Sequence, residues 1–175
     1  MTTIRINRAP VLTLWATIVA GRLGFDHEEA LTLGRAVAGI TAASKGARLG
    51  IFTPSPEGVR ERREKAAEGE EIVVDLLGRA VPTVVTPDGL RATSKGAAIA
   101  PASVQKYLAS KFGAALPEFE AAMARLALSL PPAELARRGF QLYVAFRPTV
   151  PEDASGWGAD GELDSERIEK LAAPG

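Results

Sequence analysis

Two short, nearly identical stretches carry the residue types that contact phosphate groups. Residues 43–47 read Ala-Ser-Lys-Gly-Ala and residues 93–97 read Thr-Ser-Lys-Gly-Ala. A further cation adjoins each stretch, Arg48 after the first and Arg91 before the second. A small, polar and basic loop exposes backbone N–H groups and cations, as contacts to a nucleic-acid backbone require. The alternative is that Ser-Lys-Gly is merely a favourable loop composition, and the differing flanks argue against a true repeat.

A helix expected over 101–113 brings more cations to the same part of the chain. Its outward face would present Lys106 and Lys111, and Gln105 can reach a base edge. Contacts to about four or five phosphates give weak, salt-dependent binding. The candidate nucleic-acid-binding residues are Lys45, Arg48, Arg91, Ser94, Lys95, Gln105, Lys106 and Lys111.

The helical pair expected within 10–40 is a weaker candidate for a DNA reader, although its short connection is helix-turn-helix-like. A recognition helix places its first residues against base edges. Here those residues are His27, Glu28 and Glu29, and the two carboxylates would repel phosphates. Asp26 and Glu29 are better explained as a capping box at the start of the second helix.

The motif candidates for catalysis and cofactor binding each fail a structural requirement. Residues 156–161 spell G-x-G-x-x-G, but too little chain follows for a βαβ unit. Residues 39–46 approach a P-loop but lack the glycine before its lysine and the hydroxyl residue after it. The alternating acids of 160–166 lack EF-hand spacing. Because His27 has no visible catalytic partner either, we predict no enzymatic activity, no cofactor and no metal.

The amino-acid composition excludes several further kinds of site. The 175 residues include one His and no Cys, which excludes disulfides, thiolate zinc sites and iron–sulfur clusters. Acidic and basic residues balance at 21 each, but residues 1–150 carry a net charge of +5 and residues 151–175 a net charge of −5. Such asymmetry is typical of an anion-binding body with a screening tail, or of an ordered tail that complements the surface on which it lies.

Hydrophobic spacing predicts a mainly α (α+β) protein, namely a helical bundle of about six helices with one small β-hairpin and an extended C-terminal tail. We expect a single helical domain over 1–150, divisible into a helical hairpin (1–50) and a β-hairpin with three helices (72–147). An acidic ordered tail over 151–175 would follow, with Trp157 as its anchor in an apolar groove.

The expected elements have these limits. In chain order they are a short edge strand at 2–7, helices at 10–23 and 27–40, a loop at 44–56, a charged helix at 57–71, a β-hairpin at 72–92, helices at 101–113, 117–130 and 131–147, and a short last helix from 164.

The apolar run at 9–20 follows two arginines, as the core of a signal peptide does. Within it, Leu12, Trp15 and Val19 recur at helical spacing, which indicates a helix with one preferred buried face. The run is also too short to span a bilayer. We therefore expect a cytoplasmic protein without a membrane partner.

Three stretches carry a family resemblance. They are residues 9–15 (Ala-Pro-Val-Leu-Thr-Leu-Trp), residues 31–46, which end in Ser-Lys-Gly, and the closing Phe146-Arg147-Pro148 with Gly156-Trp157-Gly158. In these the chain resembles a family of conserved bacterial proteins of unknown function. The resemblance covers most of the chain. It implies a cytoplasmic bacterial protein and brings with it no activity, cofactor or site residues.

Two functions remain open at this point. The first is weak, sequence-nonspecific nucleic-acid binding through the basic loops and helix 101–113. The alternative is a protein-interaction or homo-oligomerisation module without catalysis, favoured by the small residues of helix 27–40 and by the Trp157 tail. In either case the partners would be nucleic acid or a second copy of the chain.

Overall fold

The computed structural model describes residues 2–40, 51–149 and 160–172, and the side chain of Ile51 is not described. The helices are α1 (Arg8–Arg22), α2 (His27–Gly39), α3 (Pro56–Lys65), α4 (Pro101–Phe112), η1 (Gly113–Ala115), α5 (Leu116–Leu128), α6 (Pro132–Phe146) and α7 (Ser165–Ala172). The strands are β1 (Thr3–Asn7), β2 (Ile51–Phe52), β3 (Glu71–Leu76), β4 (Arg79–Thr86), β5 (Gly89–Ser94), β6 (Ala97–Ala98) and β7 (Asp160–Asp164).

The strands form two sheets, so the prediction of a helical bundle with one small β-hairpin is wrong. The larger sheet has the order β2-β3-β4-β5-β6, with β2 parallel to β3 and the other neighbours antiparallel. The smaller sheet pairs β1 with β7 in antiparallel register, Thr3 opposite Asp164. Strand β2 falls in the stretch predicted to be a loop. The charged helix ends at Lys65, because Ala66 adopts an extended backbone, and Glu71 already belongs to β3.

The C-terminal segment from residue 160 is held by the N-terminal strand and by α5. The Ser165 amide donates to the Thr2 carbonyl (2.9 Å), and the Ser165 hydroxyl donates to Glu118 Oε2 (3.0 Å). Hydrogen bonds from Thr2 and Ser165 hold the pKa of Glu118 below its usual range. Residues 160–164 of the expected extended tail form strand β7, and the short last helix predicted from residue 164 is confirmed as α7. Trp157, the proposed anchor, lies outside the described residues.

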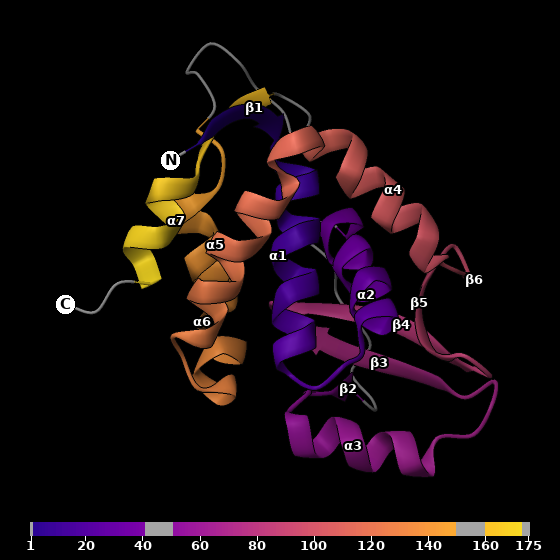
Figure 1. The fold of residues 1–175 in the computed structure, drawn as a ribbon. Coiled ribbons are helices and arrows are strands. Elements are labelled where there is room, and N and C mark those ends of the chain that lie inside the picture. Colours follow the sequence, from indigo (N-terminus) through magenta and orange to yellow (C-terminus); the bar gives the residue numbers. More distant parts are fainter. Residues whose placement is uncertain (1, 41–50, 150–159, 173–175) are drawn as a thin grey trace.

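Helix α1 runs through the centre of the molecule, between α5 and α6 on one side and α2 on the other (Figure 1). Trp15 is fully buried, donates its indole N–H to the Gly139 carbonyl (2.9 Å) and meets Phe146 edge-on. The prediction of a single buried face on α1 is wrong, because Thr13 and Thr17 are buried as well. Their hydroxyls donate to the carbonyls of Ala9 and Thr13 within the helix, so their burial leaves no hydroxyl donor unsatisfied.

Helices α1 and α2 approach each other closely at Gly34. A Cβ atom built there would meet Thr17 Oγ1, the Thr13 carbonyl oxygen (2.5 Å) and the Thr17 nitrogen (2.9 Å). The backbones of the two helices therefore pack against each other with no room for a methyl group. This contact places α2 between α1 and the larger sheet, which it meets mainly through β5.

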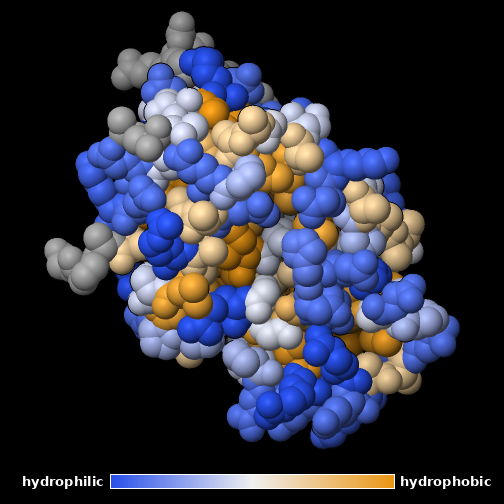
Figure 2. All heavy atoms as spheres, in the orientation of Figure 1, coloured by the Kyte–Doolittle hydropathy of each residue, from blue (hydrophilic) through white to orange (hydrophobic). Residues whose placement is uncertain are grey.

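Helix α2 also hydrogen-bonds directly to the sheet. The Ala92 amide of β5 donates to the Thr32 hydroxyl (3.0 Å), which in turn donates to the Glu29 carbonyl (3.0 Å). Helix α3 lies at the end of the molecule opposite β1, and its surface in this view is almost wholly hydrophilic (Figures 1 and 2). Among the described residues, none of the helices is long and apolar enough to cross a membrane.

We expect Gly34→Ala to lower the free energy of unfolding by about 1–3 kcal/mol, because its methyl group forces α1 and α2 apart. The matched control is Gly21→Ala near the end of α1, where a Cβ would meet nothing within 4 Å. A helical glycine with free space gains about 0.5–1 kcal/mol on replacement by alanine. Urea denaturation of both variants measures the difference, and equal effects would contradict a tight contact at Gly34.

Candidate nucleic-acid interface

Helix α4 carries two of the predicted phosphate-contacting cations, Lys106 and Lys111, at exposed positions. Residues 89–117 contain no Asp or Glu, so no carboxylate of this run offsets them. The inner face of α4 is anchored in the core by three side chains that are at most 4% exposed, Val104, Leu108 and Phe112. Lys106 and Lys111 lie off this face and are exposed. The opening Pro101 suits the first turn, because the first N–H groups of a helix have no partner within the helix.

The Tyr107 ring of α4 contacts two cations, Arg35 of α2 and Lys111 of its own helix. The Arg35 guanidinium carbon lies 4.7 Å from the centre of the Tyr107 ring, and Lys111 Nζ lies 6.0 Å from it. Both distances allow cation–π attraction. Burial raises the pKa of Tyr107 and the Arg35 charge opposes the rise. The result is a cluster of two cations around one half-buried ring, and Arg35 is a member that the sequence did not point to.

Ser94 and Lys95 lie at the turn between β5 and β6, just before α4 (Figure 1). Lys95 adopts a left-handed backbone with φ of 53°, and Gly96 follows with φ of 81°. This conformation tightens the turn, and both Ser94 and Lys95 are exposed. Lys95 is therefore exposed on a turn that precedes the first residue of α4.

Gln105 and Arg91 do not lie on this exposed surface. Gln105 is half-buried, and its Oε1 lies 3.3 Å from His27 Nε2 on α2. Arg91 is only 7% exposed; its guanidinium donates to Glu28 Oε1 (3.2 Å) and to the carbonyls of Leu90 (2.9 Å) and Asp88 (3.4 Å). Arg91 thus serves the fold and is not placed to contact a phosphate.

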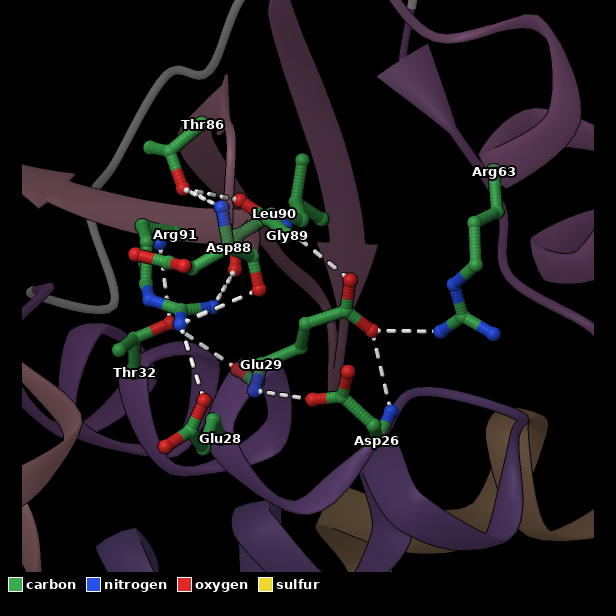
Figure 3. A network of polar contacts seen from close by, with 11 residues as sticks. Asp26, Glu28, Glu29, Thr32, Arg63, Thr86, Asp88, Gly89, Leu90 and Arg91 are labelled. Carbon is green, nitrogen blue, oxygen red and sulfur yellow. Dashed lines mark hydrogen bonds and ion pairs between the residues drawn. The ribbon is translucent and has the colours of Figure 1, made fainter.

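Beside Arg91 lies a buried carboxylate that sequence analysis identified only as a helix cap. Glu29 is 4% exposed, and its Oε1 accepts the Asp26 amide (3.0 Å) and Arg63 Nη2 (2.7 Å), while its Oε2 accepts the Leu90 amide (3.0 Å). Figure 3 shows Glu29 at the centre of this network. The capping box is confirmed. The bonds to Arg63 and Leu90 join residues far apart in the chain, for which the sequence held no local signal.

The remaining candidates fall outside this surface or outside the described residues. Lys45 and Arg48 lie in the segment 41–50, which the structure does not describe. Within residues 2–40, 51–149 and 160–172, no three His, Asp or Glu side chains gather in a way that could hold a metal ion. The predicted residues that the structure leaves exposed are therefore Ser94, Lys95, Lys106 and Lys111, and Arg35 is added to them by its contact with Tyr107.

Comparison of the chain with protein-family models, with curated proteins and with solved structures gives no match. The resemblance to a bacterial family stays a prediction for that reason. Function must be inferred from the chemistry of the surface alone.

We expect Glu29→Gln to lower the free energy of unfolding by about 2 kcal/mol, because it removes charge-assisted hydrogen bonds and sets an amide N–H₂ against N–H donors. Exchange of the Leu90 amide hydrogen should accelerate at the same time. Glu64→Gln, at an exposed position on α3, is the control and should change stability by less than about 0.5 kcal/mol. Equal stability of the two variants would contradict the organising role of Glu29.

Proposed function

We propose that the protein binds nucleic acid weakly and without sequence specificity through a basic face. This basic face consists of α4, the β5–β6 turn and Arg35 on α2. The observation that carries the proposal is the run 89–117 without any carboxylate, whose helix exposes Lys106 and Lys111. Lys111 and Arg35 lie against the same Tyr107 ring. Cations without local carboxylates attract phosphates and release condensed counterions when they bind.

The side chains around Lys106 support close approach to a phosphate backbone. Ala102, Ser103, Ala109 and Ser110 are all exposed, and all are small. A polyanion can therefore reach the helix surface without displacing bulky groups. The Ser103 hydroxyl donates to the Ala100 carbonyl (2.8 Å), so Ser110 is the serine that would add a hydrogen-bond donor to phosphate oxygens.

The same geometry argues against reading of base sequence. Gln105, the one amide of α4, faces His27 on α2 and is half-buried. Tyr107 is flanked by Arg35 and Lys111, so its ring is not free to stack on a base. Contacts to the backbone position a protein on nucleic acid but carry no sequence information, so the proposed binding is nonspecific.

The alternative of a homo-oligomerisation module is favoured by a separate observation. Leu128 at the end of α5 is 68% exposed and Leu171 near the end of α7 is 37% exposed. Helices α5 and α7 run side by side in the same direction, with Ser165 on Glu118 and Arg125 on Glu169, so the two leucines lie at neighbouring ends. Two exposed leucines at neighbouring helix ends offer a small apolar surface that a second copy of the chain could cover.

The variant Lys106→Ala/Lys111→Ala should bind a fluorescein-labelled 20-base-pair DNA more weakly than the unmodified chain. The slope of log affinity against log salt should fall by about 1.8, since each lost phosphate contact contributes about 0.9. Fluorescence anisotropy between low and moderate salt measures this slope.

The control is Arg60→Ala/Lys65→Ala, which removes the same charge from exposed positions on α3, at the opposite end of the molecule from α4 (Figure 1). This control should leave the slope unchanged. An equal loss in both variants, or no binding by the unmodified chain at low salt, would refute the proposed function.

For oligomerisation, we expect the unmodified chain to sediment as a dimer at high concentration and Leu128→Glu to sediment as a monomer, because a carboxylate buried at a subunit contact is costly. Sedimentation velocity over a range of concentrations measures both. An unmodified chain that stays monomeric at every concentration would refute the oligomerisation alternative and leave the nucleic-acid proposal unaffected.

A further inference from the structure

A cavity of about 470 Å³ lies between the start of α2, helix α3 and the β4–β5 turn. Its volume falls in the range of small-molecule sites. Much of its wall is apolar and comes from six elements and turns of the chain, through Phe25, Phe52, Val59, Ile72, Val85 and Leu90. A concave, partly aromatic cavity with polar groups at fixed places is the general form of a ligand site.

The walls of this cavity are held in place before any ligand arrives. Glu29, which lines the cavity, bonds to the start of α2, to Arg63 on α3 and to the Leu90 amide beside the β4–β5 turn. These are the same three parts of the chain that enclose the space. A preformed site loses little free energy to ordering when a ligand binds.

Two guanidinium groups line the cavity, but each already faces a carboxylate. Arg63 Nη2 lies 2.7 Å from Glu29 Oε1. Arg62 Nη2 lies 3.7 Å from Glu70 Oε2, and its guanidinium carbon lies 5.9 Å from the centre of the Phe52 ring. The positive charges of the cavity are therefore offset within the protein.

Three further carboxylates line the cavity without such compensation. Asp26, Glu68 and Asp88 are exposed, and among the described residues none of the three forms an ion pair with a cation. One oxygen of Asp26 accepts the Glu29 amide (2.8 Å), which leaves its second oxygen for a ligand. Carboxylates around an apolar recess create a negative potential that attracts cations.

We propose that this cavity binds a small molecule with an aromatic or branched apolar body and a protonated amine. The apolar body packs against Phe25 and Phe52, and the ammonium group faces Asp88, Asp26 and Glu68. The cavity shares no side chain with the basic face, so this site stands whether or not the protein binds nucleic acid.

The test compares two probes of similar shape and opposite charge, 2-phenylethylamine and 3-phenylpropanoate. Each is titrated into the ¹⁵N-labelled full chain at physiological ionic strength, and the amide shifts of Ile72, Gly89 and Leu90 are followed. The amine should shift these signals with saturation, and the carboxylate should bind at least about threefold more weakly.

Variants assign the effect to the cavity carboxylates. Glu68→Gln/Asp88→Asn keeps the shape of both side chains, and it should raise the dissociation constant of the amine at least about threefold. The control is Glu61→Gln/Glu64→Gln, which removes the same charge from exposed residues of α3 outside the cavity lining and should leave the constant unchanged.

Three results would overturn the proposal. The first is the absence of saturable shifts at Ile72, Gly89 and Leu90 with the amine. The second is equal binding of the two probes, and the third is equal binding of the amine by the two double variants. Unchanged amide spectra of the variants without ligand show that the fold is retained in each.

Discussion

A carboxylate shut off from water must be satisfied by the protein itself, and this requirement at Glu29 organises one half of the molecule. Its oxygens collect N–H groups from the start of α2, from Arg63 and from the Leu90 amide. Because none of these elements can move alone without leaving a charge unpaired, the helical pair, α3 and the larger sheet keep one arrangement. The cavity is enclosed by the same elements, so its shape follows from the same bonds.

Burial also decides what each cation of the run 89–117 does. Arg91 donates to Glu28 on α2 and to the Leu90 and Asp88 carbonyls beside the β4–β5 turn, and it contributes to the packing of sheet against helix. Lys95, Lys106 and Lys111 point into solvent from a turn and from the outer side of α4. Cations of the same run therefore have two roles. The buried Arg91 stabilises the fold, and the exposed lysines are free to contact a partner.

Local sequence patterns predicted the starts of several helices, but they could not predict which distant strands pair. The capping box at Asp26 and the prolines Pro101 and Pro132 mark the starts of α2, α4 and α6 as expected. Strands β1 and β7 are five residues each and lie at opposite ends of the chain, so no local pattern reveals their register. Thr13 and Thr17 resemble a solvent face in sequence but are buried, since a hydroxyl satisfied within its own helix needs no water.

A formal charge of zero conceals two surfaces of opposite character. The run 89–117 has cations without carboxylates, and the cavity between α2, α3 and the β4–β5 turn has three carboxylates without cation partners among the described residues. Salt screens exposed charges over about 8–10 Å, so each surface acts on its own surroundings and net charge says little about either. The two proposals accordingly assign a polyanion to α4 and an amine to the cavity. The two proposed sites therefore discriminate between ligands by the sign of charge before any contact forms.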